Sequence, residues 1–158
     1  MNTSKTELDI TRLIKAPPEK VWTAWSEPKH FARWWIPAPI ECQVVKLDLH
    51  PGGGFETLMR EPGKDWQPHV DGCVLDVVAG ERIVFTTALR EGWHPVDSWL
   101  TLTAIITLKP EDGGTRYSAR VLHKTPEDSQ KHDDMGFHEG WGTAIDQLAA
   151  FVGAQKDN

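Results

Sequence analysis

Hydrophobic and polar residues alternate along most of the chain between residues 41 and 123, which is the period of a β-strand. Turns rich in glycine and proline interrupt this alternation, most clearly at Pro51–Gly54 and Pro110–Gly114. The pattern predicts six strands, at 41–49, 55–60, 69–78, 81–89, 98–108 and 115–123. Because the connections are short, we expect these strands to form an antiparallel meander.

The residues before the meander predict one strand and two short helices. Alternation gives a strand at 8–14, which Pro17–Pro18 ends. Proline is tolerated in the first turn of a helix, and apolar residues then recur at helical spacing as far as Pro28. A second helix is predicted at 29–35, and it ends before Ile36–Pro37.

The last part of the chain predicts one long amphipathic helix at about 127–153. Thr125 and the acidic residues after it are typical of a helix N-terminus, because they satisfy free backbone amides there. A break near Gly136 is compatible with the pattern. The apolar face consists of residues spaced three and four apart: His138, Trp141, Ile145, Leu148 and Val152. The element order predicts an α+β fold in which a curved antiparallel sheet wraps around this helix.

The predicted strand at 115–123 has one apolar and one polar face. The residues expected to face the interior are Tyr117, Ala119 and Val121. The residues expected to face solvent are Arg116, Ser118 and Arg120. Burial of two unpaired guanidinium groups would cost several kcal/mol, so the register of this strand is strongly determined.

Length and charge limit the classes of function. A chain of 158 residues is expected to form one domain, 1–158. Lys and Arg number 17 and Asp and Glu number 23, so the net charge is −6 and no basic cluster is present. Nucleic acid and anionic membrane are therefore not expected partners. The sequence contains neither an apolar signal segment nor a membrane span, which predicts a cytoplasmic protein.

Metal sites and catalytic motifs are not apparent in the sequence. Cys42 and Cys73 lie in predicted strands without the spacing of metal ligands, so we expect free, buried thiols. His123, His132 and His138 lie near the junction between sheet and last helix but lack the spacing of a helical ligand pair. We expect no metal and no cofactor. With acidic neighbours, these histidines could instead orient a ligand or transfer a proton.

Two groups of glycines bear on function. Gly52–Gly54 follows a strand and leads to another strand, whereas a phosphate-binding loop leads to a helix, so these glycines form a turn. Gly136, Gly140 and Gly142 lie in the predicted last helix, where each costs about 1 kcal/mol relative to alanine. They either allow close contact with the sheet or leave cavity volume beside the helix, and the two roles are compatible.

Eight tryptophans occur with a single tyrosine. Some tryptophans are expected to fill the core, but so many large amphipathic side chains suggest that several line a cavity. Trp34 and Trp35 are adjacent and cannot both point inward from a regular helix. The residues expected to contact a ligand in the cavity are Trp34, Trp35, Phe55, Trp66, Trp99, Tyr117, Val121, Phe137, His138, Trp141 and Ile145.

Three segments, together with the element order, resemble the START-like, helix-grip superfamily. The segments are Ala16–Trp22, the pair Trp34–Trp35, and Met135–Trp141. Within the superfamily, the chain is similar to proteins named after the C-terminal domain of the activator of heat-shock-protein-90 ATPase. The resemblance covers about residues 8–153, taken as the domain core. It implies a curved antiparallel sheet around a long C-terminal helix, with two short helices after the first strand.

The resemblance implies three alternative functions. Members of the superfamily include lipid and hormone carriers and cyclases of polyketide synthesis, and the family name derives from a co-chaperone domain. We expect the binding of a small or medium apolar ligand in a cavity between sheet and helix. One alternative is a co-chaperone-like module that stimulates a heat-shock chaperone ATPase in the stress response. The other is a cyclase or hydrolase that uses the same cavity. The protein is expected to be a monomer or a homodimer.

Overall fold

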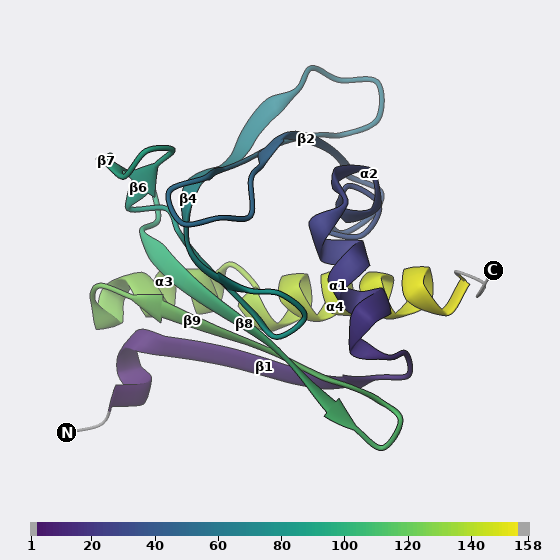
Figure 1. Ribbon diagram of the computed structural model, residues 1–158. Helices are drawn as coiled ribbons and strands as arrows, with labels where there is room; N and C mark the ends of the chain where they lie inside the picture. Colours follow the sequence, from purple (N-terminus) through teal and green to yellow (C-terminus); the bar gives the residue numbers. More distant parts are fainter. Residues whose placement is uncertain (1–2, 155–158) are drawn as a thin grey trace.

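A seven-stranded antiparallel sheet and a C-terminal helix that lies along it organise the chain (Figure 1). The computed structural model describes residues 3–154, so the ends of the predicted domain, 1–2 and 155–158, lie outside the described residues. The elements, in chain order, are η1 Thr3–Thr6, β1 Glu7–Ile14, α1 Pro18–Ser26, α2 Pro28–Phe31, β2 Glu41–Leu47, β3 Gly54–Arg60, β4 Gln67–Val78, β5 Arg82–Thr86, β6 Leu89–Arg90, β7 His94–Pro95, β8 Leu102–Glu111, β9 Gly114–His123, α3 Pro126–Asp134 and α4 Phe137–Ala154.

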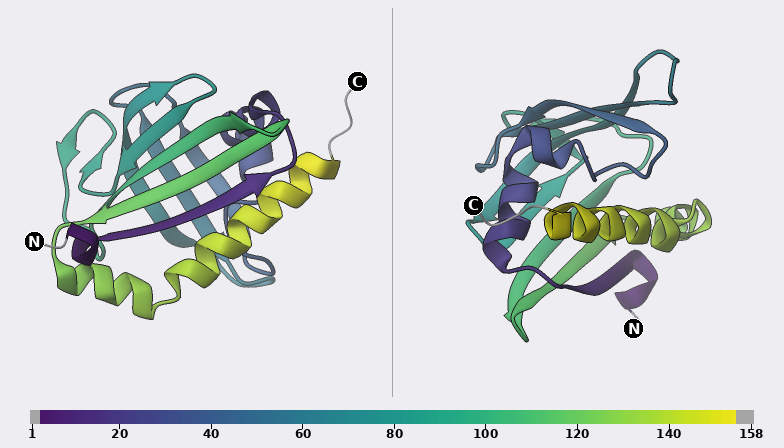
Figure 2. Two further views of the ribbon diagram at one scale, coloured as in Figure 1. Left: turned by 90° about the horizontal axis from the view of Figure 1, so that it is seen from below. Right: turned by 90° about the vertical axis from the view of Figure 1, so that its right-hand side faces the viewer.

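The sheet has the strand order β1-β9-β8-β5-β4-β3-β2, and each neighbouring pair is antiparallel. This order confirms the predicted meander and adds β1 at the β9 edge. The register shifts within the pairs β2–β3, β3–β4 and β4–β5. Extra residues of this kind bend a strand and increase its twist. The sheet is accordingly curved, and α4 lies within its concave side (Figure 2).

The alternation predicted for β9 is confirmed. Tyr117, Ala119 and Val121 are buried. On the opposite face, the Arg116 guanidinium is paired with Glu111, and Nη2 of Arg120 lies 2.6 Å from a carboxylate oxygen of a residue in β1. Two guanidinium groups thus remain hydrated on the convex face while the aromatic and aliphatic side chains enter the core.

Two predicted strands are shorter than the alternation suggested. β5 ends at Thr86 and β8 begins only at Leu102, with the separate hairpin β6–β7 between them. The Thr87 hydroxyl donates to the carbonyl oxygen of Leu100 (3.0 Å) and accepts from the amide of Leu102 (2.9 Å). A side-chain hydroxyl therefore provides bonds that a neighbouring strand would otherwise provide, and residues 96–101 follow an irregular path.

The predicted last helix is two helices, α3 and α4, separated at Gly136. This glycine has φ of 90°, a conformation that residues with a Cβ rarely adopt. The predicted N-terminal cap is confirmed, because the Thr125 side chain accepts a hydrogen bond from the amide of Asp128 (3.0 Å). Within residues 3–154, no helix has the length and apolar character needed to cross a membrane.

The second short helix ends earlier than predicted. α2 stops at Phe31, and turns carry the chain through the next residues. Trp34 and Trp35 are 1% and 8% exposed, so both rings are buried. The indole nitrogen of Trp34 donates to the carbonyl oxygen of Ala24 (2.9 Å). Adjacent tryptophans that could not both point inward from a helix do so from this irregular segment.

An aromatic cluster fills the space between the short helices and the sheet. Its centre is Trp25, which is fully buried and donates from Nε1 to the hydroxyl of Tyr117 (2.8 Å). Five rings surround it at centroid distances between 4.7 and 6.4 Å: Phe31, Trp34, Trp35, Phe55 and Phe85. This cluster joins α1 and α2 to β3, β5 and β9.

Both cysteines are free thiols, as predicted. Cys73 is fully buried, and Cys42 is half-buried in β2. Burial raises the pKa of the Cys42 thiol to about 11. Because the thiolate is the reactive form, Cys42 is a weak nucleophile at neutral pH.

The cap at Thr125 should contribute measurably to stability. We expect Thr125→Ala to lower the free energy of unfolding by about 1 kcal/mol, because the amide of Asp128 loses its acceptor. Thr125→Ser keeps the hydroxyl and is the matched control. Urea denaturation of the three proteins measures the difference. Equal stability of the alanine and serine variants would contradict the role assigned to the cap.

Candidate functional site

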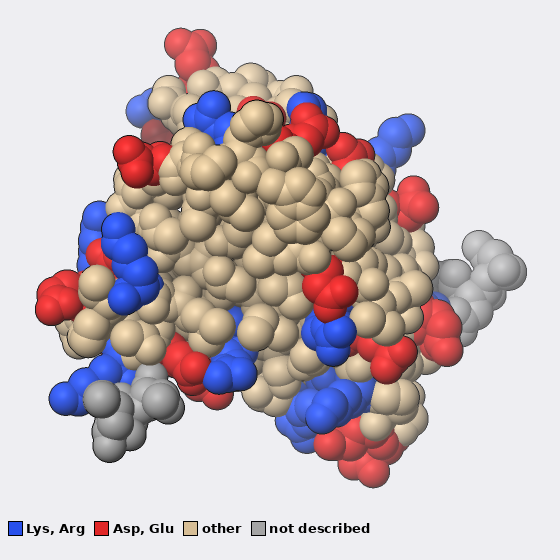
Figure 3. Space-filling model, turned by 60° about the vertical axis from the view of Figure 1, so that its left-hand side comes forward, with Lys and Arg blue, Asp and Glu red and all other residues tan. Residues whose placement is uncertain are grey.

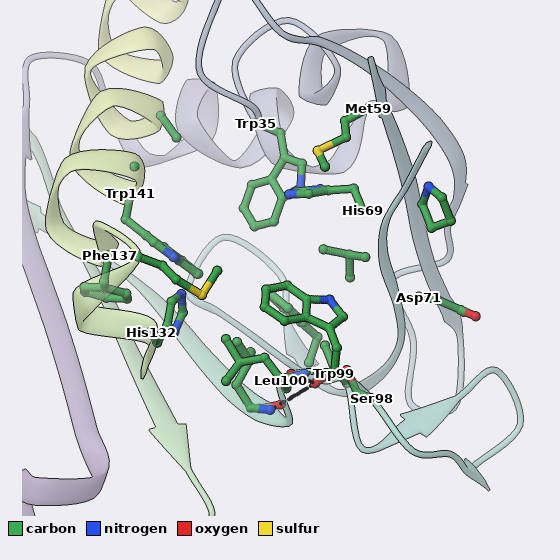
Figure 4. Close-up of a pocket in the computed structure, with 18 of the residues that line it drawn as sticks. Trp35, Met59, His69, Asp71, Ser98, Trp99, Leu100, His132, Phe137 and Trp141 are labelled. Carbon is green, nitrogen blue, oxygen red and sulfur yellow. Dashed lines mark hydrogen bonds between the residues drawn. The ribbon is translucent and has the colours of Figure 1, made fainter. Parts of the chain in front are cut away.

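A cavity of about 700 Å³ lies between the concave side of the sheet and the helices α3 and α4 (Figure 4). Side chains from β4, β5 and β9 form its floor, and α4 forms one wall. The turn after α2 and the irregular segment 96–101 complete the lining. The cavity therefore lies between the two layers of the fold and opens to solvent on one side.

Aromatic rings from α4 and from the turn after α2 contact each other in the cavity wall. The rings of Trp35 and Trp141 have centroids 5.8 Å apart at an interplanar angle of 79°, and Phe137 lies beside Trp141 at 5.5 Å (Figure 4). Ile145 continues this face one turn further along the helix. Apart from its chain neighbours and the adjacent helix backbone, a Cβ placed on Gly140 would have no atom within 4 Å. The absence of a side chain at Gly140 therefore leaves space at the cavity wall.

Exposed side chains mark where the cavity opens to solvent. Trp99 and Met135 line the cavity although they are 64% and 54% exposed. The Lys131 ammonium donates to the carbonyl oxygen of Trp99 (3.1 Å) and lies 5.3 Å from the centre of its ring. Asp71 and Arg90, which also line the cavity, form an ion pair at 3.2 Å. Apolar surface and a neutralised pair of charges thus lie together at the opening.

The surface view agrees with a largely uncharged face. Figure 3 shows a broad area without charged side chains, and Lys, Arg, Asp and Glu lie mainly around it.

His69 is one of two uncharged imidazoles in the cavity wall. Its Nδ1 lies 3.0 Å from the hydroxyl of Thr57 in β3. Burial lowers the pKa of His69 to about 4. At neutral pH this residue therefore supplies a polar but uncharged edge to the cavity.

His132 of α3 is the second imidazole. Its Nδ1 lies 2.9 Å from Nε2 of His123, whose Nδ1 lies 3.1 Å from the carbonyl oxygen of Thr6. That carbonyl only accepts, so Nδ1 of His123 donates to it. With one hydrogen on the His123 ring, at Nδ1, its Nε2 can only accept a hydrogen bond. His132 therefore donates from Nδ1 to Nε2 of His123 and keeps a lone pair on its own Nε2. Burial and then the neighbouring His123 lower the pKa of His132 to about 4.

The described residues offer no metal site. No group of three or more His, Cys, Asp or Glu side chains within residues 3–154 is placed to hold an ion. The polar side chains that line the cavity include His69, His132 and the charged residues Asp71, Arg90 and Asp97.

Most residues predicted to contact a ligand are brought together at this cavity. Those that line it are Trp34, Trp35, Trp99, Tyr117, Phe137, Trp141 and Ile145. They come from segments far apart in the sequence, including the turn after α2, β9 and α4. Whether they contact a ligand stays a prediction, whereas their common location is a property of the structure.

The prediction for His138 was wrong as to its position. Its side chain is 56% exposed, and Nδ1 lies 3.6 Å from the carboxylate of Asp133. α4 is turned so that Phe137 rather than His138 faces the cavity with Trp141, which lies four residues further on. A shift of one residue rotates a helical position by about 100°, enough to move His138 to the solvent side.

Three other predicted residues also lie away from the cavity. Phe55 is fully buried and stacks on Phe85 at 4.3 Å, behind the cavity wall. Val121 is fully buried in β9 as part of the core. Trp66, in the β3–β4 connection, packs under the guanidinium of Arg60 at 4.2 Å. Each is aromatic or apolar as expected, but its side chain packs against protein groups and does not line the cavity.

The sequence analysis missed His69 as part of the cavity wall. In the pair β3–β4, Thr57 opposes Val70 and Leu58 opposes Pro68, so His69 is the extra residue of a bulge. A bulge redirects side chains relative to strict alternation. Because the alternation rule assumes an unbroken ladder, it contains no signal for this orientation.

The lowered pKa values of His69 and His132 predict a stability that depends on pH. A base whose pKa is lowered by folding binds protons more readily in the unfolded chain. The free energy of unfolding that depends on the two neutral imidazoles is therefore fully present above pH 6.5. It falls as the pH is lowered from 6.5 to about 4. We expect His69→Gln and His132→Gln each to reduce this loss, measured by urea denaturation across that range. Unchanged pH profiles in both variants would contradict the assignment.

Comparison with known proteins supports the architecture. A crystal structure of a protein from Nitrosomonas europaea shares 36% sequence identity, with 99% of each chain covered and a TM-score of 0.88. A crystal structure of a protein from Mycobacterium smegmatis shares 26% identity, covering 99% of this chain and 96% of that one, with a TM-score of 0.81. A solution structure from Arthrobacter aurescens, at 23% identity and a TM-score of 0.83, covers 99% of this chain and 91% of its own and supports the fold alone. No curated protein matches the chain.

The family profile described as "Activator of Hsp90 ATPase homolog 1-like protein" matches residues 15–153. The match begins in the connection between β1 and α1 and ends within α4, so it includes the whole meander and both layers around the cavity. Together with the helix-grip arrangement of sheet and helix, the match supports a ligand-binding or co-chaperone-type module. The chain therefore belongs to the family of activator of Hsp90 ATPase homolog 1-like proteins.

Proposed function

We propose that this protein binds a small or medium-sized apolar molecule in the cavity between the sheet and α4. The observation that carries the proposal is the cavity itself, about 700 Å³ in volume and lined mainly by aromatic and aliphatic side chains. Ligand sites in proteins are typically of this size and character. The uncharged imidazoles of His69 and His132 add polar contacts without introducing charge.

The cost of Gly140 to helix stability also supports the proposal. An interior glycine weakens a helix by about 1 kcal/mol relative to alanine. A Cβ at Gly140 would meet no atom within 4 Å, so steric conflict with the sheet does not require glycine here. A position that keeps space at the cavity wall at the expense of helix stability is readily explained if the space is occupied by a ligand.

The co-chaperone alternative has support from the family description and from the exposed side chains Trp99 and Met135. A protein partner would use an exposed surface, however, and would leave the enclosed part of the cavity without a role. Stimulation of ATP hydrolysis by a heat-shock chaperone is the assay that distinguishes this alternative.

The cyclase or hydrolase alternative would rely on His69 or His132, which are weak bases because their pKa values are about 4.

Binding of the fluorophore ANS tests the proposal. We expect ANS to bind the native protein at neutral pH and Trp141→Ala to weaken binding by up to about tenfold, because a ring of the wall is lost. His138→Ala is the matched control on the same helix and should leave binding unchanged, since His138 faces solvent. ANS binding that appears only after partial unfolding would contradict the proposal and favour the co-chaperone alternative.

Filling the cavity with a larger side chain should weaken ANS binding while it raises the stability of the fold. We expect Gly140→Leu to raise the free energy of unfolding by about 1 kcal/mol or more, since a helix-favouring residue enters open space. The same variant should bind ANS more weakly, because the leucine side chain occupies part of the cavity. Calorimetric unfolding and ANS titration of one preparation measure both effects. A stabilised variant that binds ANS as well as the wild type would place the ligand elsewhere.

A further inference from the structure

A chain of hydrogen bonds begins at a backbone carbonyl and ends at the cavity wall. Nδ1 of His123 donates to the carbonyl oxygen of Thr6 (3.1 Å), and Nε2 of His123 lies 2.9 Å from Nδ1 of His132. Because a carbonyl oxygen only accepts, each bond in the chain has a single direction when both rings are neutral. The chain therefore holds the hydrogen of His132 on Nδ1 and leaves a lone pair on its Nε2.

Nε2 of His132 is both unpaired and accessible. No described residue forms a hydrogen bond with this atom. The side-chain polar atoms in residues 3–154 that are closed off without a partner are Nδ1 of His30, Nε1 of Trp35 and Oδ2 of Asp128, so Nε2 of His132 is not closed off. The half-buried His132 lines the cavity, and its ring packs edge to face against that of Phe137 at 5.1 Å (Figure 4). A hydrogen-bond acceptor is therefore available at the cavity wall.

The imidazole of His69, which also lines the cavity, has no such fixed direction. Its Nδ1 lies 3.0 Å from the hydroxyl of Thr57, and a hydroxyl can either donate or accept. Both neutral forms of His69 are therefore compatible with its protein partner. His132 differs because its surroundings specify which hydrogen-bonding group it presents.

We infer that the ligand carries a hydrogen-bond donor of the hydroxyl class, as an apolar alcohol or phenol does, and that this hydroxyl donates to Nε2 of His132. The inference rests on the proposed function and narrows it from apolar molecules in general to hydroxylated ones. A hydroxyl that leaves water without finding a partner is costly, and a site with an unpaired acceptor disfavours analogues that lack the donor. His123 is a positioning residue, because it holds the hydrogen of His132 on Nδ1.

The test uses 2-hydroxyfluorene and 2-fluorofluorene, flat tricyclic molecules of nearly equal size of which only the first is a donor. Displacement of ANS at about pH 8, where imidazole and phenol groups are both uncharged, gives the affinity of each. The ratio of the two affinities cancels effects on cavity shape and stability. We expect this ratio to fall about tenfold in His132→Phe, which keeps an aromatic ring and removes the acceptor. His138→Phe is the matched control at a histidine that faces solvent, and it should keep the wild-type ratio.

The position of the hydrogen on His132 provides a second measurement. Long-range proton–nitrogen NMR correlations identify the ring nitrogen that carries it. We expect the hydrogen on Nδ1 in the wild type and partly on Nε2 in His123→Phe, where Nδ1 has lost its acceptor. The affinity ratio should fall in His123→Phe as well, because the lone pair of Nε2 is then only partly available.

Three results would contradict the inference and leave the proposed function intact, provided that ANS binds the native protein. They are a wild-type affinity ratio in His132→Phe, a wild-type hydrogen on Nε2 of His132, and a ratio that falls in His69→Phe but not in His132→Phe. Failure of both compounds and of ANS to bind the native protein would remove the proposed function as well.

Discussion

The hydrogen bond from Nε1 of Trp25 to the hydroxyl of Tyr117 joins the two layers on which the rest of the structure depends. It ties α1 to β9 inside an aromatic cluster, where few other groups could satisfy either polar atom. Beyond this cluster, α4 packs against α1 and β1. Its N-terminal part, near Phe137 and Gly140, borders the cavity.

The parts of the fold that could be predicted from sequence follow local rules. Alternation along the strands predicted the meander, and it placed Tyr117 inside and Arg116 outside because a buried unpaired charge is costly. Thr125 followed by Pro126 located the start of α3, since the capping interaction involves only neighbouring residues. The order of the elements predicted that the sheet wraps around the long helix, and the resemblance to a known family implied the same arrangement.

Much of the candidate site depends on departures from those rules. The bulge that turns His69 toward the cavity comes from pairing between two strands, and the early end of α2 that buries both Trp34 and Trp35 comes from tertiary packing. The position of His138 was predicted wrongly, because helical spacing fixes relative but not absolute rotation. Leu100, which lines the cavity next to the predicted Trp99, was likewise missed, since its hydrogen bond to Thr87 is not visible in a repeat pattern.

The central claim is that an apolar molecule occupies the space between the sheet and α4. Intermolecular nuclear Overhauser effects between bound ANS and the protein test it most directly, because they arise only between protons that lie close together. The account predicts effects to the ring protons of Trp35, Phe137 and Trp141 in the cavity. Effects confined to the ring of Trp93, which is exposed and does not line the cavity, would contradict it, since they would locate the molecule on the surface.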